Sequence, residues 1–210
     1  MNDLLTPLTF SRGPSIKNRF MLAPLTNTQS FEDGTLSEEE FKWLTMRAEG
    51  GFGLTMTCAA HVQAIGKGFP GQLGVFSDQH LEGLKRLASK IQMNDSVAIC
   101  QLHHAGMRSP KELIGKAPVC PSVNEKFNAR ALTSKEVETL RDDFIGAAIR
   151  SELAGFDGVE LHAAHGYMIA QFLSAGINKR QDDYGQTLNN RCRLLYEIID
   201  GIRKECSKDF

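Results

Sequence analysis

Four short apolar runs, each followed by a segment with apolar residues at helical spacing, constrain the fold of this chain most strongly. The runs cover residues 19–23, 53–59, 97–102 and 156–161, and the segments after them begin near Ser37, Ser77, Thr133 and Asn190. The runs are continuous in apolar residues, which is typical of strands buried on both faces of a parallel sheet. This repeated order of strand and helix predicts an α/β fold with four βα units.

Capping signals mark where two of the predicted helices begin. Ser37 with Glu40, and Thr133 with Glu136, have the spacing of a capping box, in which each side chain bonds the backbone N–H of the other residue. Apolar residues then recur on one face of each predicted helix, namely Phe41, Leu44 and Ala48; Leu81, Leu84, Ala88 and Ile91; Val137, Leu140, Phe144 and Ala148; and Leu194, Leu195, Ile198 and Ile202. We expect these faces to pack on the sheet.

Polar residues at the ends of the predicted strands bear on how the sheet closes. Thr26, His61, Gln101 and His162 each lie at or just after the end of a strand. Both an open doubly wound sheet and part of a (β/α)8 barrel accommodate four βα units. No Gly-x-Gly-x-x-Gly follows the first strand, which weakens the open-sheet reading. Contributions from successive strand ends around one rim favour the barrel.

Two imidazoles and a phenol lie within six residues after the fourth strand. They belong to His162, His165 and Tyr167. The carboxyl ends of parallel strands are where α/β proteins bind ligands. Histidine and tyrosine can donate a proton, or a hydrogen bond to a developing negative charge. We therefore expect a small-molecule enzyme site, although the histidine pair by itself is equally consistent with a structural role. A metal site that includes Glu160 is a weaker alternative, because the sequence places no third ligand.

Charge and composition exclude several classes of function. The formal net charge is −1, with 41% hydrophobic and 23% charged residues, which is ordinary for a globular protein and offers no electrostatic case for nucleic acid or an anionic membrane. No apolar run is long enough to span a bilayer and the first residues lack signal-peptide features, so we expect a cytoplasmic protein. The scattered cysteines, Cys58, Cys100, Cys120, Cys192 and Cys206, are expected to be free thiols, and no metal is expected.

Four motifs occur in a characteristic order. They are Asn-Arg-Phe-Met-Leu-Ala-Pro-Leu-Thr at 18–26, Gln-Leu-His-His-Ala-Gly-Met-Arg at 101–108, Gly-Phe-Asp-Gly-Val-Glu-Leu-His-Ala-Ala-His-Gly-Tyr at 155–167, and a polar loop that includes Asn178, Arg180, Asp183 and Arg191. Together they resemble the old yellow enzyme family, the FMN-dependent NAD(P)H:flavin oxidoreductases and ene-reductases. The resemblance covers essentially the whole chain. Segment 174–178 lacks the proline usual in the family and segment 185–187 departs from a common Gly-Gly-Ser, which affects loop geometry and not chemistry.

The resemblance implies a TIM barrel that holds FMN at the carboxyl ends of its strands. NADH or NADPH would reduce the flavin, which would then pass hydride to an activated C=C bond of an enone, enal or nitroalkene. By analogy with the family, His162 and His165 would bind the substrate's oxygen and Tyr167 would supply the proton. The residues implied in cofactor binding are Ala23, Pro24, Leu25, Thr26, Ala59, Gln101 and His162.

The resemblance also bears on the extent of the domain and on partners. Family barrels have eight strands, so residues 1–210 are expected to form the amino-terminal half of a TIM-barrel flavin oxidoreductase domain, with about four βα units. We expect a homo-oligomer, or pairing with a missing carboxyl-terminal half. Two alternatives remain open: a catalytically incomplete half-barrel that acts as a scaffold, and another TIM-barrel enzyme that uses the histidine pair for a metal.

Other polar residues receive weaker predictions. His103 and His104 are adjacent, so at most one should face the site, and neither is assigned a role. His61 and His80 are expected in loops or at the surface, and Met21 in the core. Arg180, Asp183 and Arg191 are interpreted as ion pairs that hold the polar loop. The long connection 103–131 is expected to be functional or disordered.

Overall fold

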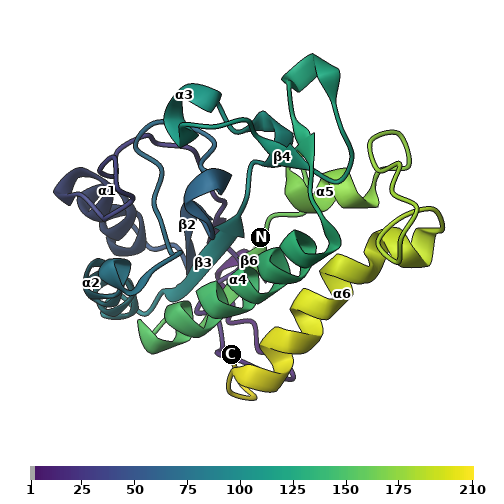
Figure 1. Cartoon of the computed structure of the whole chain (residues 1–210). Helices are drawn as coiled ribbons and strands as arrows, with labels where there is room; N and C mark the ends of the chain where they lie inside the picture. Colours follow the sequence, from purple (N-terminus) through teal and green to yellow (C-terminus); the bar gives the residue numbers. More distant parts are fainter. Residues whose placement is uncertain (1–2) are drawn as a thin grey trace.

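The computed structural model describes residues 3–210 of the chain (Figure 1). Its strands are β1 (Met21–Leu22), β2 (Leu54–His61), β3 (Val97–His103), β4 (Val119–Cys120), β5 (Arg130–Ala131) and β6 (Gly158–Leu161). Its helices are α1 (Glu38–Glu49), α2 (Leu81–Gln92), α3 (Lys111–Ile114), α4 (Ser134–Leu153), α5 (Met168–Leu173) and α6 (Leu188–Glu205). All four predicted βα units are present. α3, β4 and β5 lie in the connection from β3 to α4, and α5 lies in the connection from β6 to α6.

The main sheet is parallel and follows the order of the chain. Its strand order is β1-β2-β3-β6, as four successive βα units require. Leu54 pairs with Met21 on one side and with Val97 on the other, and Ile99 pairs with Gly158. The register of β2 on β3 shifts between Met56 and Ala59, which marks a bulge in β2. Parallel pairing brings the carboxyl ends of all four strands to one edge.

The helices that follow the strands contact one another in the same order as the strands. α1 packs on α2, α2 on α4, and α4 lies beside α6, as Figure 1 shows for the last pair. In an open doubly wound sheet the helices are divided between the two faces, whereas in a barrel they form one outer layer. This single layer confirms the barrel-type reading of the sequence.

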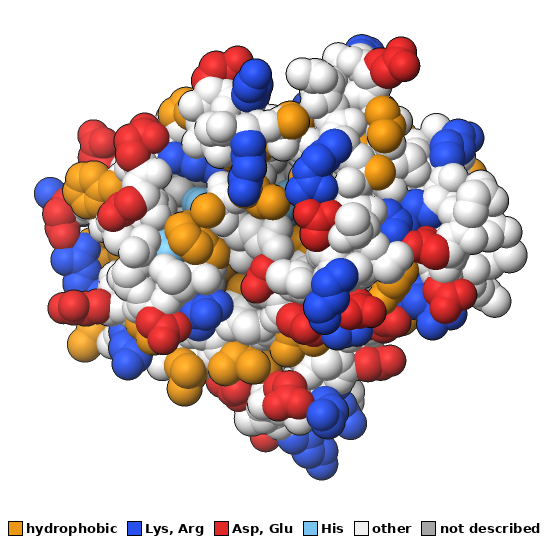
Figure 2. Space-filling view, viewed as in Figure 1, with side chains coloured by type: hydrophobic (Ala, Val, Ile, Leu, Met, Phe, Trp, Pro, Cys, Tyr) orange, Lys and Arg blue, Asp and Glu red, His pale blue; other side chains and the backbone are white. Residues whose placement is uncertain are grey.

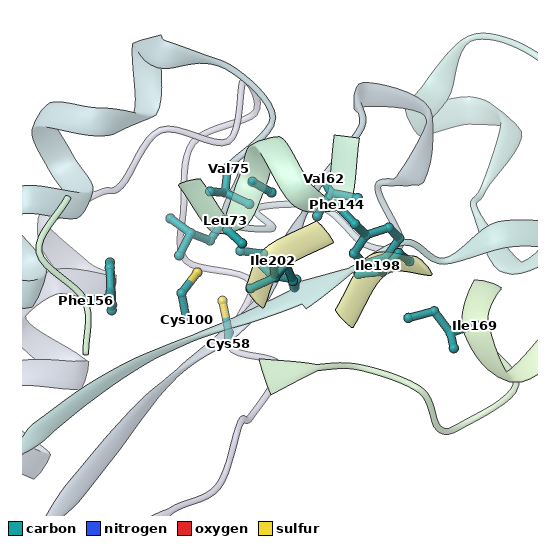
Figure 3. Close-up of a cluster of buried hydrophobic side chains, with 14 of the residues drawn as sticks. Cys58, Val62, Leu73, Val75, Cys100, Phe144, Phe156, Ile169, Ile198 and Ile202 are labelled. Carbon is teal, nitrogen blue, oxygen red and sulfur yellow. The ribbon is translucent and has the colours of Figure 1, made fainter. Parts of the chain in front are cut away.

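A core of apolar side chains lies between the sheet and this helical layer. Leu44, Leu84, Phe144 and Leu194 are fully buried, each from a predicted apolar helix face. Figure 3 shows part of the core, which includes Cys58 of β2, Cys100 of β3, Phe144 of α4 and Ile198 of α6. All five cysteines are free thiols, as expected.

The amino terminus of α4 offers a test of the capping interpretation. The Glu136 N–H donates to Thr133 Oγ1 at 3.2 Å, and the Thr133 N–H donates to Glu136 Oε2 at 2.8 Å. We expect Thr133→Ala to lower the free energy of unfolding by about 1 kcal/mol, because the Glu136 N–H loses its acceptor. Urea denaturation measures this, and Thr133→Ser should restore most of the loss because it keeps the hydroxyl. Equal destabilisation by both variants would contradict the cap.

Two predicted helix starts differ in detail from the structure. Ser37 caps α1 as expected, but the Glu40 side chain does not return to the cap. It is buried instead, and accepts hydrogen bonds from Ser30 Oγ and Cys58 Sγ. Helix α6 begins at Leu188, with Thr187 as its cap, two residues before the predicted start near Asn190. The Thr187 hydroxyl accepts a hydrogen bond from the Asn190 N–H, so the capping residue lies three residues before Asn190.

The long connection after β3 is ordered. It contains α3 and the small parallel pair β4–β5, in which Val119 pairs with Arg130. The guanidinium of Arg180 donates to the carbonyl oxygens of Pro121 and Leu132 and so ties this connection to the polar loop. These bonds hold the connection in a fixed position against the polar loop.

The polar loop is held as predicted, but by different partners. Arg180 forms its ion pair with Asp182 and not with Asp183. Arg191 donates to the carbonyl oxygens of Leu173 and Gln186 and forms no ion pair with the described residues. For Arg191, backbone carbonyl oxygens take the place of the expected carboxylate, because the main chain of the loop lies against its guanidinium.

His61 and His80, expected in loops or at the surface, are buried, and each is 2% exposed. Strand β2 continues to His61, two residues beyond the predicted strand. The ring of Phe76 lies between the two imidazoles, with centroids 4.9 Å from His61 and 4.6 Å from His80. The glycine at position 74 leaves room for this packing, because a Cβ there would lie 2.7 Å from His80 Nε2.

The edge strand β1 exposes apolar side chains. Met21, predicted in the core, is 51% exposed because β1 has a strand partner only in β2 among the described residues. Phe20 is 43% exposed beside it.

On the face shown in Figure 2, Lys and Arg side chains are interspersed with Asp and Glu. Within residues 3–210, no helix combines the length and the apolar character that crossing a membrane requires.

Candidate active site

The carboxyl ends of the four main strands surround a cavity of about 610 Å³, a size typical of small-molecule sites. Its lining comprises Ala23, Pro24, Thr26, Ala59, Phe69, Gln101, Glu160, Leu161, His162, Ala163, Ala164, His165 and Tyr167. Of the residues predicted at the site, Leu25 does not reach this cavity. Its side chain is 51% exposed, whereas Pro24 and Thr26 on either side of it line the cavity.

The segment after β6 reverses direction and brings Tyr167 back beside His162. His165 and Gly166 both adopt left-handed backbone conformations, with φ of 53° and 69°. A left-handed histidine is uncommon and is held only where the surroundings enforce it. Gln171, which is fully buried, donates to the carbonyl oxygens of Gly166 and Ala105 and thereby fixes the segment against the turn after β3.

His162, His165 and Tyr167 form one cluster at the cavity. The ring centroid of His162 lies 5.1 Å from that of His165 and 4.9 Å from that of Tyr167. The Ala164 N–H donates to His162 Nδ1, so in the neutral ring the proton is on Nε2, which lies 3.3 Å from His165 Nδ1. No described residue hydrogen-bonds to the Tyr167 hydroxyl. With the His162 N–H directed at His165 Nδ1, the donors left for a ligand are His165 Nε2 and the Tyr167 hydroxyl.

A third imidazole completes the cluster, and the sequence did not assign it a role. The His103 ring centroid lies 4.3 Å from that of Tyr167 and 5.4 Å from that of His162. Its Nδ1 accepts a hydrogen bond from Gln72 Nε2 at 3.0 Å, and no described residue bonds Nε2. His104 turns away, with Nε2 3.0 Å from Gln63 Oε1, so one of the two adjacent histidines faces the site as predicted. The sequence could not predict the contact between His103 and Tyr167, because the two residues are far apart in the chain.

Burial favours the neutral form of two imidazoles, those of His162 and His103. Removal from water, followed by the neighbouring His165, lowers the pKa of His162, and Glu160 acts in the opposite direction. Burial also lowers the pKa of His103 well below its usual value, and the nearby His162 and His104 act in the same direction. Near neutral pH these rings can therefore donate through N–H groups without carrying a charge.

One pair of side chains in the cavity wall joins two strands. Gln101 of β3 and Glu160 of β6 are register partners, and Gln101 Nε2 donates to Glu160 Oε1 at 2.6 Å. The Gln101 N–H is left without a strand partner by the bulge in β2 and donates instead to Thr57 Oγ1. Glu160 therefore serves as a hydrogen-bond acceptor to Gln101.

Within residues 3–210, no group of three histidine, cysteine, aspartate or glutamate side chains is placed to hold a metal ion.

Comparison with known proteins identifies the family of this chain. Residues 3–210 match the model of the NADH:flavin oxidoreductase / NADH oxidase family. The probable NADH-dependent flavin oxidoreductase YqiG of Bacillus subtilis (strain 168) is 41% identical over 98% of this chain and 56% of its own length. An NADPH dehydrogenase of Bacillus cytotoxicus is 39% identical over 96% of this chain and 59% of its own. The chain belongs to the NADH:flavin oxidoreductase / NADH oxidase family, and it spans little more than half the length of these two relatives.

Solved structures show the same fold. A 2-naphthoyl-CoA reductase in complex with 2-naphthoyl-CoA matches with a TM-score of 0.94 and 33% identity over 100% of this chain and 34% of its own. The old yellow enzyme homologue from Zymomonas mobilis matches with a TM-score of 0.89 and 31% identity over 96% of this chain and 60% of its own. The predicted fold class is confirmed: the chain is α/β and has four βα units of a TIM barrel of the old yellow enzyme type.

Proposed function

We propose that this chain provides the strand-end site of an FMN-dependent NAD(P)H oxidoreductase that reduces activated C=C bonds, and that residues 1–210 form the amino-terminal half of its barrel. The observation that carries the proposal is the convergence of His162, His165 and Tyr167 on a cavity whose opposite wall is built from small apolar residues and one amide. Relatives named as NADH-dependent and as NADPH-dependent support either nicotinamide as the reductant.

The residues of the cavity fit a flavin. Ala23, Pro24 and Ala59 would pack against the flat ring, and Gln101 would hydrogen-bond its pyrimidine part, as the family resemblance implied. Thr26 would lie near the reactive edge of the ring. The Gln101 side-chain oxygen has no partner among the described residues and can accept a ring N–H. When bound, FMN supplies the hydride that adds to the activated alkene.

The protein's own groups would act on the substrate. The N–H of His165 would hold the carbonyl or nitro oxygen, and so would that of His162 once this oxygen replaces His165 Nδ1 as its acceptor. Both groups would stabilise the negative charge that develops there. Tyr167, whose hydroxyl has no partner among the described residues, would donate the proton to the carbon next to that group. Burial around His162 and His103 excludes water from one side of the cluster and keeps these imidazoles neutral.

Anaerobic flavin spectroscopy tests the proposal. The purified protein is loaded with FMN, reduced with NADH or NADPH, and mixed with an enone, enal or nitroalkene. We expect the nicotinamide to bleach the flavin absorption band and the alkene to restore it. The matched control is the saturated ketone, which lacks the C=C bond and should leave the band bleached. Failure of the protein to bind FMN, or equal recovery with the saturated ketone, would contradict the proposal.

A further inference from the structure

Gln101 is held at the cavity wall by hydrogen bonds to two different strands. The Gln101 backbone N–H donates to Thr57 Oγ1 of β2 at 3.1 Å, and the threonine hydroxyl donates in turn to the Cys58 carbonyl oxygen. Its side-chain Nε2 donates to Glu160 Oε1 at 2.6 Å. Gln101 is 6% exposed and lines the cavity together with Glu160. Both ends of this residue are therefore fixed.

The chemistry of the glutamate determines which way the Gln101 amide faces. A carboxylate has acceptors and no donor, so it can bond the amide NH₂ group but not the amide oxygen. The oxygen must then lie away from Glu160. Among the described residues no donor bonds Gln101 Oε1, and this atom is not enclosed by protein, so it faces the cavity. The wall presents an acceptor at this point.

We propose that Glu160 is a positioning residue, which fixes the Gln101 amide with its oxygen toward the cavity and so selects a ligand ring that presents an N–H there. An imide-type ring edge, in which an N–H lies between two carbonyls, has this chemistry. That edge occurs in the pyrimidine part of a flavin. The identification of the ring as a flavin rests on the proposed function, whereas the positioning role of Glu160 does not. Among the described residues that line the cavity, Glu160 is the only aspartate, glutamate, lysine or arginine.

Side-chain NMR of the 210-residue chain tests the orientation without flavin or turnover. In ¹⁵N-labelled protein, the Gln101 side-chain NH₂ resonances should follow the titration of one carboxyl group. Glu160→Gln should abolish that titration, whereas Glu160→Asp should keep it because the carboxylate remains. Glu39→Gln removes the same charge from an exposed position and should leave the Gln101 resonances unchanged. Resonances that titrate equally in Glu160→Gln and the parent protein would overturn the proposal.

Flavin affinity and reduction potential provide the second measurement, made on the flavin-loaded protein. Glu160→Gln should weaken FMN binding by about tenfold, because the amide can then turn and meet the ring N–H with a second donor. It should also make the potential of the bound flavin more positive, because a negative charge beside the ring is lost. Glu160→Asp should restore most of both values, and Glu39→Gln should match the parent protein.

The two proposals fail in different ways. If the Gln101 resonances respond as expected but the protein binds no FMN, the positioning role of Glu160 stands and the proposed function fails. If FMN binds and alkenes are reduced, but Glu160→Gln behaves like Glu39→Gln in resonances, affinity and potential, the positioning role fails alone.

Discussion

Replacing Tyr167 with phenylalanine is expected to slow alkene reduction by about 10²- to 10⁴-fold, the usual contribution of a positioned general acid. Flavin reduction by NADH or NADPH should be nearly unchanged, because that step needs no proton from the phenol. The Tyr167 ring is held by the T-shaped contact with His103 and by the guanidinium of Arg108, 5.1 Å from its centroid. Phenylalanine preserves these ring contacts and removes the hydroxyl alone.

Stopped-flow measurement of the two half-reactions separates the steps. Tyr196→Phe is the matched control, because that tyrosine is 57% exposed on α6, away from the cavity. It should leave both half-reactions at the parent rate. A Tyr167→Phe variant that reduces alkenes as fast as the Tyr196→Phe variant would remove Tyr167 from the mechanism. Equal slowing of both half-reactions in Tyr167→Phe would instead indicate displaced flavin.

Acid should destabilise this protein well before its carboxylates become protonated. Burial lowers the pKa of His61 to about 4, despite the opposing hydrogen bond to the Gln63 carbonyl, and lowers the pKa of His104 to about 3. Each folded-state pKa lies below the value of about 6.5 in an unfolded chain. The stabilisation from keeping each ring neutral is therefore complete above about pH 6.5 and is lost as the pH falls toward the folded-state pKa.

The expected loss is large for a domain of this size. Between about pH 6.5 and 4.5 each ring should remove about 2 to 3 kcal/mol from the free energy of unfolding, because protons bind the unfolded chain first. Urea denaturation across this pH range measures the loss. His104→Gln should flatten the dependence by about a third, because the buried rings of His61 and His103 also contribute. A pH-independent free energy of unfolding in the parent protein would contradict this account.

Much of the fold could be predicted because its signals are local. The Thr133 and Glu136 pair caps α4 as its spacing indicated, since a capping box involves residues three apart on one turn. The apolar faces of the four long helices are in the core for a similar reason: helical periodicity depends on neighbouring residues. Strand ends were less accurate, and β1 is reduced to Met21–Leu22 because an edge strand has few partners.

The site could be predicted only in part. The His162, His165 and Tyr167 cluster comes from one short segment, so its composition was readable, but the left-handed turn at His165 and Gly166 was not. The roles of His103 and Gln72, and the burial of His61 and His80, depend on how β2, β3 and the segment after β2 lie against one another. No local pattern reports such contacts, because the residues are far apart in the chain.

By itself, the sequence determined the order of the four βα units and the placement of polar residues at the strand ends. It did so because alternation of apolar runs and helical periodicity is a property of consecutive residues. The tertiary structure alone decided that Gln101 meets Glu160, that Arg180 pairs with Asp182 within the loop while reaching the carbonyls of the long connection, and that Leu25 turns away from the cavity. These outcomes depend on strand register, a bulge in β2 and competition between backbone and carboxylate acceptors, which are settled only when distant segments pack together.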